Sequence, residues 1–181
     1  MSIKGSPVNI NNYVGRYGRF HSMTDIDTVG VLGAGSMGHG IAQVSAMAGH
    51  DVIMRDIEDD FVQQGLSEIE NNLEAGIERG KVSQEEMQDT LQRLSGTTSI
   101  ETAVSNADLV IEAIPEQLSL KKETFESVDE HAPTDAILAT NTSSLSVTEI
   151  ASTLEDPGRM VGLHFFKPAH IMPIVEIVLA E

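Results

Sequence analysis

The chain has no cysteine among its 181 residues, and this absence excludes several kinds of chemistry. A disulfide framework, a thiolate nucleophile and a zinc site with cysteine ligands are all ruled out. The histidines other than His164 show no spacing that is typical of metal ligands. The sequence therefore indicates no metal site.

Long apolar runs are also missing. No segment is apolar over the length that a bilayer requires, and the N-terminus lacks the apolar stretch of a secretory signal. We therefore expect a cytoplasmic protein that does not associate with membranes.

Basic residues are scarce in this chain. Lys and Arg total 11 against 28 Asp and Glu, which gives a formal net charge of −17. Such a charge repels nucleic acid and anionic membranes. An ordinary acidic surface is one explanation, and adaptation to a salt-rich cytoplasm is the other, because the Debye length falls to roughly 3 Å at 1 M salt. The small number of lysines favours the second, halophilic explanation, which we treat as a hypothesis.

Apolar residues make up 40% of the chain, which predicts a folded globular protein with room for one domain. Residues 1–22 differ from the rest, since they carry glycines, a proline and a basic bias without any periodicity. We expect them to form a flexible N-terminal extension. Residues 23–181 are then the folded domain.

The domain alternates short apolar strands with helices. We expect strands over 26–32, 51–55, 109–114, 136–139, 160–165 and 174–179. We expect helices over 36–48, 57–79, 83–94, 120–130 and 146–153. This order predicts an α/β fold with a doubly wound, mostly parallel sheet of the Rossmann type. The two helices over 57–94 form a helical hairpin inserted after the second strand.

The strongest local motif is Gly33-Ala34-Gly35-Ser36-Met37-Gly38. It follows an apolar strand and opens a helix, and Asp56 closes the next strand 18 residues after Gly38. That context is typical of a dinucleotide-binding site rather than of a structural glycine turn. An FAD site uses the same fingerprint, so the motif alone leaves both cofactors open.

Each part of the motif has its own physical role. Gly33 permits a tight turn, Gly35 lets the backbone approach a pyrophosphate, and Gly38 lets the helix pack closely on the strand. Ser36 and Met37 lie at the helix N-terminus, whose N–H groups favour phosphate. Asp56 accepts hydrogen bonds from ribose hydroxyls and repels the 2′-phosphate of NADP, so we expect NAD. The neighbouring Arg55 opposes that preference.

Four further stretches carry a family resemblance. They are ADLVIEAIPE at 107–116, NTSSLS at 141–146, GLHFF at 162–166 and IVEIV at 174–178. With the glycine motif, their order and spacing over residues 25–179 resemble the L-3-hydroxyacyl-CoA dehydrogenases, including the 3-hydroxybutyryl-CoA dehydrogenases. The resemblance implies NAD-dependent, reversible oxidation of an L-3-hydroxyacyl-CoA to a 3-ketoacyl-CoA, in β-oxidation of fatty acids or butyrate-type metabolism. It also argues against FAD.

The resemblance implies a role for each matching residue. His164 falls on the catalytic histidine, Glu176 on its carboxylate partner, and Ser143 on a serine that contacts substrate and cofactor. Glu116 and Lys121 fall on positions that contact the nicotinamide side of NAD.

The chemistry of the reaction agrees with these roles. Alcohol oxidation needs a base for the hydroxyl proton while hydride leaves, and histidine suits that task. A carboxylate orients the imidazole and favours its charged form. His164 and Glu176 lie 12 residues apart, so an antiparallel hairpin centred near residue 170 places them opposite each other. Glu112 lies inside a strand and is interpreted as structural.

The chain departs from the family at residue 167. An asparagine that contacts the nicotinamide region usually follows the Phe-Phe pair, and this chain has Lys167 there. Lys167 is therefore a candidate cofactor contact with a different shape and charge. A salt bridge to Glu116 and a contact with a CoA phosphate are two further possibilities, which the sequence does not rank.

The chain also stops at Glu181, whereas relatives continue into a helical domain that supplies substrate contacts and a dimer interface. We expect that domain to be absent here, so a homo-oligomer or a separate chain is a candidate partner besides the acyl-CoA substrate. Two alternatives to the acyl-CoA dehydrogenase therefore remain open. One is an NAD-binding module that is inactive on its own, and the other is a related NAD-dependent 3-hydroxyacid dehydrogenase.

Overall fold

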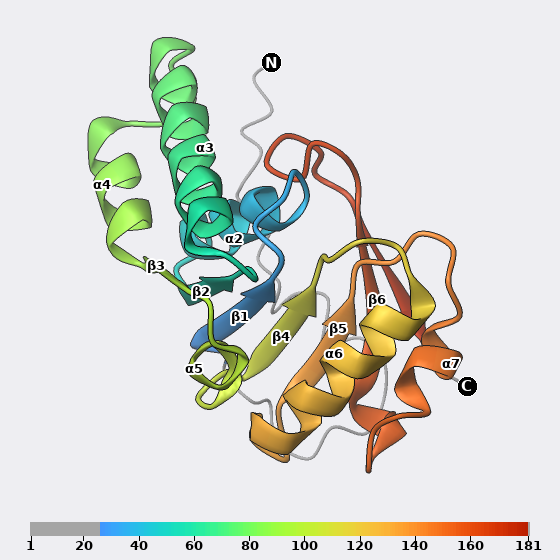
Figure 1. Cartoon of the computed structure of the whole chain (residues 1–181). Coiled ribbons are helices and arrows are strands. Elements are labelled where there is room, and N and C mark those ends of the chain that lie inside the picture. The colour runs from blue at the N-terminus through green and yellow to red at the C-terminus, as the bar shows by residue number, and fades with distance from the viewer. Residues whose placement is uncertain (1–25, 181) are drawn as a thin grey trace.

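The computed structural model describes residues 26–180, so the predicted extension over 1–22 lies outside the described residues. Within them, one sheet of seven strands has the order β3-β2-β1-β4-β5-β6-β7 (Figure 1). All neighbouring strands are parallel except β6 and β7, which are antiparallel. The predicted doubly wound, mostly parallel α/β fold is therefore confirmed.

The strands and helices follow the predicted order closely. The strands are β1 Thr28–Leu32, β2 Asp51–Arg55, β3 Leu94–Thr97, β4 Leu109–Glu112, β5 Ile137–Thr140, β6 Met160–Phe165 and β7 Val175–Leu179. The helices are α2 Gly38–Met47, α3 Asp59–Glu78, α4 Gln84–Gln92, α5 Ile100–Val104, α6 Leu118–His131, α7 Val147–Ala151 and the 3₁₀ helix Pro157–Arg159.

Helices cover both faces of the sheet. Successive strand residues point to opposite faces, so apolar residues in a row place apolar surface on each face. In β1, Val31 packs in a core with α2, α3 and α4, whereas the next residue, Leu32, packs in a second core with α5, α6 and α7. In β4, Ile111 and Val110 divide in the same way. The strands therefore read as continuous apolar runs, as expected of a sheet buried on both faces.

The helical hairpin after the second strand is present as α3 and α4, which extend beyond the sheet (Figure 1). The second helix begins with a capping box. Glu86 N–H donates to Ser83 Oγ at 3.1 Å, and Ser83 N–H donates to Glu86 Oε2 at 2.7 Å. These reciprocal bonds satisfy two backbone donors that a helix start would otherwise leave unpaired.

Three elements were not predicted from the sequence, namely β3, α5 and the 3₁₀ helix. The segment LSGT of β3 is short, has no fully buried residue and lacks the apolar run that marks the other strands. Gly96 in β3 lets α3 approach, since a Cβ there would lie 2.3 Å from Val62 Cγ1. The five residues of α5 are too few to show a helical period, although the Ser99 side chain caps the helix through Thr102 N–H at 3.2 Å.

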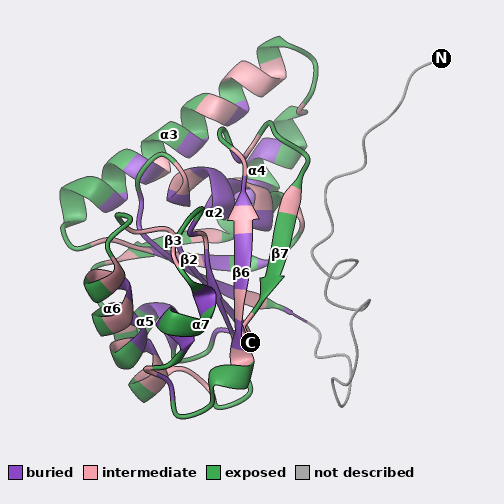
Figure 2. Cartoon of the chain, turned by 90° about the vertical axis from the view of Figure 1, so that its right-hand side faces the viewer, coloured by how far each residue is buried: buried purple, intermediate pink, exposed green. Residues whose placement is uncertain are grey.

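The last two strands form the antiparallel hairpin expected near residue 170. Their register pairs His164 with Glu176 and Leu163 with Ile177. The outer strand β7 is an edge and is largely exposed (Figure 2). Ile177, Val178 and Leu179 leave apolar surface uncovered there. Among the described residues, no helix is long and apolar enough to cross a membrane.

Candidate active site

The glycine motif forms the loop between β1 and α2, and its three glycines have different surroundings. Gly33 has a φ of +104°, and a Cβ there would lie 2.6 Å from the Ala113 carbonyl oxygen. A Cβ on Gly38 would lie 1.7 Å from the Gly33 carbonyl oxygen. By contrast, apart from Gly35 itself and its two chain neighbours, no described atom lies within 4 Å of a Cβ built on Gly35. Gly33 and Gly38 are thus required by the fold, whereas the space over Gly35 is open to a ligand.

The N-terminus of α2 points its positive end toward this loop. Met37 occupies the N-cap position, and its side chain makes no capping hydrogen bond to any described residue. The first turn holds no acidic residue that would neutralise the helix dipole. Backbone N–H groups at such an end favour an anionic group such as a phosphate. Ser36 is exposed beside them.

Asp56 lies directly after β2 and is held against the glycine loop. Its Oδ2 accepts from Ala34 N–H at 2.7 Å, and its Oδ1 accepts from Ile57 N–H at 2.7 Å. A carboxylate offers roughly four acceptor positions, so two backbone donors orient the group and leave others available. The neighbouring Arg55 donates from Nε to the Thr98 carbonyl oxygen at 3.0 Å.

A buried cluster of charges supports the carboxyl ends of β4 and β5. Lys121 is 1% exposed, and its Nζ lies 2.6 Å from Glu112 Oε1 and 3.3 Å from Glu116 Oε2. The second oxygen of Glu112 accepts from Thr140 Oγ1 at 2.6 Å. Glu112 therefore has a partner on each oxygen, in keeping with a structural role. Lys121 also lines the cleft described below, with its ammonium group paired to both glutamates.

Glu116 shapes the loop after β5. It accepts hydrogen bonds from Thr142 Oγ1, from Ser143 N–H at 3.1 Å and from Ser144 Oγ at 3.3 Å. Partial burial alone would raise the pKa of Glu116. The hydrogen bond from Thr142, the charge of Lys121 and the Ser143 N–H together outweigh burial and lower that pKa below its ordinary value. Glu116 is thus held as a carboxylate beside Ser143.

His164 and Glu176 meet across the β6–β7 pair. The His164 Nδ1 lies 2.9 Å from Glu176 Oε2, as their register requires. The ring of Phe166 packs against the imidazole, with centroids 4.9 Å apart. The end of β6 is tied to the end of β5, because Phe165 N–H donates to Asn141 Oδ1 at 2.8 Å. The imidazole is therefore fixed relative to the loop that carries Ser143.

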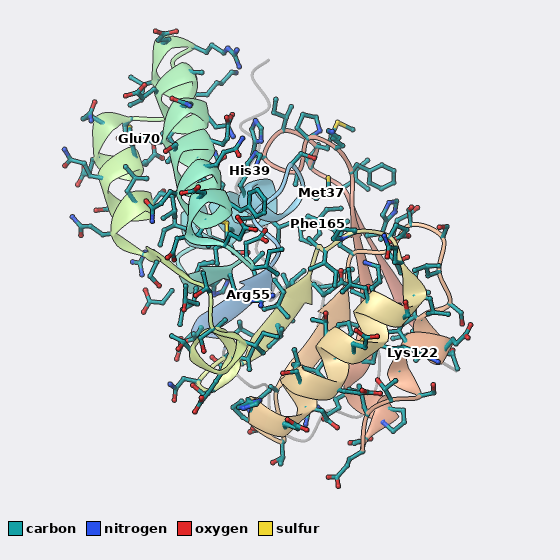
Figure 3. All side chains as sticks on the ribbon, viewed as in Figure 1. Met37, His39, Arg55, Glu70, Lys122 and Phe165 are labelled. Carbon is teal, nitrogen blue, oxygen red and sulfur yellow. The ribbon has the colours of Figure 1, made fainter. Side chains whose placement is uncertain are left out.

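These groups surround a cleft of about 330 Å³ at the carboxyl ends of the parallel strands. Figure 3 labels Met37 and Phe165 close together at this edge of the sheet. Such an edge is where open α/β sheets bind ligands. The cleft is lined by Met37, Ala113, Ile114, Glu116, Lys121, Asn141, Ser143, His164, Phe165, Phe166 and Lys167.

The cleft brings together six of the residues that the sequence analysis selected, namely Met37, Glu116, Lys121, Ser143, His164 and Lys167. The other selected residues lie beside it, with the glycines, Ser36 and Asp56 at the loop and Glu176 behind His164. The suggested salt bridge between Lys167 and Glu116 is not formed. Lys121 is the lysine that pairs with Glu116, and Lys167 makes no ion pair with any described residue.

The described residues contain no cluster of side chains that is typical of a metal site. Over residues 26–180, no group of three or more histidine or acidic side chains has an arrangement that would hold a metal ion.

A known protein family matches most of this chain. The family described as "3-hydroxyacyl-CoA dehydrogenase, NAD binding domain" matches residues 28–181. The chain belongs to the 3-hydroxyacyl-CoA dehydrogenase family. Its cofactor is NAD, and the open space at Gly35 beside the uncapped N-terminus of α2 fits a dinucleotide pyrophosphate.

Similar curated proteins carry related names. The 3-hydroxyadipyl-CoA dehydrogenase of Escherichia coli is 44% identical over 86% of this chain and 33% of its own length. A probable 3-hydroxybutyryl-CoA dehydrogenase of Bacillus subtilis is 40% identical over 85% of this chain and 53% of its own length. The chain therefore spans about a third to a half of the length of these two relatives.

Solved structures of this family confirm the fold. The 3-hydroxybutyryl-CoA dehydrogenase of Escherichia coli superposes with a TM-score of 0.82 at 42% identity, covering 85% of this chain and 32% of that one. The (S)-3-hydroxybutyryl-CoA dehydrogenase of Ralstonia eutropha gives a TM-score of 0.84 at 37% identity, covering 86% and 55%.

Sequence reasoning missed the residues that hold the site in shape. Asn141 ties β5 to β6, and Thr142 binds Glu116 and caps the following turn through Leu145 N–H at 3.0 Å. Both lie in the NTSSLS stretch, but nothing local to the sequence gives their partners. Those partners lie 24 and 26 residues away along the chain.

Proposed function

We propose that this chain carries the cofactor site and the general base of an L-3-hydroxyacyl-CoA dehydrogenase, which oxidises L-3-hydroxyacyl-CoA to 3-ketoacyl-CoA. One observation carries the proposal: His164, whose Nδ1 lies 2.9 Å from Glu176 Oε2, lines the same cleft as Met37 of the glycine loop. NAD supplies the hydride acceptor when it is bound.

The proton is handled by His164. With Nδ1 bonded to the Glu176 carboxylate, the neutral imidazole carries its hydrogen on Nδ1 and leaves Nε2 as the acceptor. No described residue hydrogen-bonds to that nitrogen. His164 Nε2 therefore takes the proton of the 3-hydroxyl group, and Glu176 stabilises the imidazolium that forms. In the reverse direction the imidazolium protonates the carbonyl oxygen.

The other selected residues hold the two ligands. Gly33, Gly35, Ser36, Met37 and Gly38 receive the pyrophosphate, and Asp56 binds the adenosine ribose hydroxyls. Glu116, Lys121 and Lys167 lie on the nicotinamide side. Ser143 contacts both substrate and cofactor, since it lines the cleft with His164.

The substrate class is supported by the names of the relatives, which include 3-hydroxyadipyl-CoA and 3-hydroxybutyryl-CoA dehydrogenases. Subunits of fatty acid oxidation complexes are also similar to this chain, one of them at 42% identity. The names of these relatives support a reaction in fatty-acid or butyrate-type metabolism.

A second candidate is an NAD-binding module that needs a partner for turnover. It is favoured by the exposed apolar strip on β7. Val178 and Leu179 are 48% and 61% exposed, and such patches commonly mark interfaces. We propose that this strip packs against a helical domain.

Adaptation to salt is a further part of the proposal. At a net charge of −17, surface carboxylates repel one another, and a cytoplasm rich in KCl screens that repulsion. The melting temperature of the chain should then rise as KCl is added. A melting temperature that stays constant or falls would contradict the halophilic interpretation.

The function is tested by mixing the purified chain with NADH and acetoacetyl-CoA at high KCl and following NADH absorbance. NADH binding is followed separately by fluorescence, and His164→Gln is the matched variant. NADH oxidation that disappears in His164→Gln supports a working site in this chain.

Binding of NADH without oxidation supports the module that needs a partner and contradicts turnover by the chain alone. Absence of NADH binding contradicts both candidates.

A further inference from the structure

The charged groups that line the cleft are paired, with one exception. Glu116 is paired with Lys121, and His164 is bonded to Glu176. Lys167 also lines the cleft, yet its ammonium group has no hydrogen bond or ion pair with any residue in the described part of the chain. Lys167 is therefore the one charged group of the cleft lining that no described residue neutralises.

The position of Lys167 is fixed by packing behind it. It follows β6 in the turn that leads to Ala169, which is buried against α2. A Cβ on Gly40 of α2 would lie 3.1 Å from the Ala169 Cβ, so the turn and the helix are in close contact. The backbone at Lys167 therefore lies between the end of β6, which carries His164, and a residue packed against α2.

Lys167 and His164 line one and the same cleft of about 330 Å³, so both residues border one ligand space. Across a cleft of this size two unit charges still interact appreciably where water is partly excluded. A positive charge on Lys167 thus acts on any charge that the nicotinamide ring carries beside His164.

The two forms of the cofactor differ in that charge. The nicotinamide ring of NAD⁺ carries one positive charge that the ring of NADH lacks, whereas the remainder of the dinucleotide is the same. We propose that Lys167 sets the relative affinity of this cleft for the two forms, disfavouring NAD⁺ against NADH. The inference rests on the proposed function, because it needs the nicotinamide ring to lie in the cleft.

A bias of this kind has a consequence for the reaction. Tight binding of NADH favours the complex that reduces the 3-keto group, and weak binding of NAD⁺ speeds its release after hydride transfer. Lys167 is therefore a specificity-determining residue for the redox state of the cofactor rather than a group that moves the proton.

The test compares dissociation constants for NADH and NAD⁺, measured by fluorescence and by titration calorimetry. Measurements are made at the lowest KCl concentration that keeps the chain folded by circular dichroism. Lys167→Met removes the charge at similar length, and Lys167→Arg keeps it. Lys81→Met is the matched control, because Lys81 is also exposed and without an ion pair to the described residues but lies in the turn between α3 and α4.

In Lys167→Met, the ratio of the NAD⁺ to the NADH dissociation constant should fall about fivefold to tenfold, chiefly through tighter binding of NAD⁺. The ratio should change less than twofold in Lys167→Arg and in Lys81→Met.

An unchanged ratio in Lys167→Met, with both forms still bound, overturns the inference and leaves the proposed function standing. Equal loss of both forms in Lys167→Met but not in Lys167→Arg also overturns it, because the lysine then acts on the shared part of the dinucleotide. If the unaltered chain binds neither form, the proposed function fails with it.

Discussion

The imidazole of His164 and the carboxylate of Glu176 lie opposite each other on adjacent antiparallel strands, with Nδ1 and Oε2 2.9 Å apart. The pair is formed by backbone register, so neither side chain needs a flexible loop to reach the other. Because Glu176 is 59% exposed, the carboxylate orients the imidazole from the solvent side while the cleft receives the opposite ring edge.

Replacing the histidine should separate binding from catalysis. In whichever assembly of the chain turns over, His164→Gln should lower kcat by about 10²–10⁴-fold, since a general base contributes about that factor. NADH affinity should stay within about twofold, because His164 adds no charge to the phosphate or ribose sites. Steady-state kinetics and NADH fluorescence measure the two effects. Equal losses of binding and kcat would contradict the assignment.

The glycine loop should give opposite results at two of its positions. Gly35→Ala should leave the melting temperature nearly unchanged and weaken NADH binding at least tenfold, because its Cβ enters only the space assigned to pyrophosphate. Gly38→Ala should lower both the melting temperature and the affinity for NADH, since its Cβ collides with the Gly33 carbonyl oxygen. Thermal denaturation and NADH fluorescence distinguish them. A Gly35→Ala chain that binds NADH normally would remove the pyrophosphate from this loop.

Asp56 should control the choice between NAD and NADP. Asp56→Asn keeps an oxygen that can accept from Ala34 N–H and loses the charge, whereas Asp56→Ala loses both. Each variant should weaken NAD binding and reduce the ratio of NAD affinity to NADP affinity. Asp56→Ala should also destabilise the glycine loop more than Asp56→Asn does, because it loses the acceptor for Ala34 N–H. Titrations with both cofactors provide the measurement. NAD affinity equal to that of the unaltered chain in Asp56→Ala would contradict the cofactor assignment.

Acid should destabilise the chain through His170, which lies half-buried in the turn between β6 and β7. Burial, followed by the charges of His39 and Arg79, lowers the pKa of His170 below its ordinary 6.5. The folded state thus disfavours the protonated ring. Its stability is complete above the unfolded-state pKa and is lost as the pH falls through the folded-state pKa.

The melting temperature of the chain should accordingly drop between about pH 7.5 and pH 5.5, and His170→Gln should reduce that drop. His131→Gln is the control, because His131 lies on α6 away from this turn. Glu116, whose pKa is also lowered, adds a separate loss only at more acidic pH, below its ordinary 4.5. An equal pH dependence in His170→Gln and the unaltered chain would show that other groups cause the acid effect.

The sequence predicts the parts of this molecule that have a local signature. The order of strands and helices, the glycine loop with Asp56 and the opposition of His164 and Glu176 all follow from periodicity, turn residues and spacing. The strand β3 was missed because LSGT has no fully buried residue and no apolar run.

The supporting contacts of the cleft could not be predicted, because they join residues that the fold alone brings together. The buried pair of Lys121 with Glu112 spans nine residues, but only the packing of α6 on the sheet makes it a buried pair. Likewise, the sequence does not tell which lysine pairs with Glu116. The structure shows that Lys121 does so and that Lys167 has no ion pair with any described residue.

The central claim is that the nicotinamide of NAD lies in the cleft beside His164, and a crystal structure of the chain with NADH tests it most directly. We expect the pyrophosphate over the glycine loop and the adenosine ribose at Asp56. We also expect the nicotinamide ring between Ser143 and His164, next to the nitrogen that faces away from Glu176. A pyrophosphate away from residues 33–38, or a nicotinamide ring outside the cleft with His164 still bonded to Glu176, would contradict it.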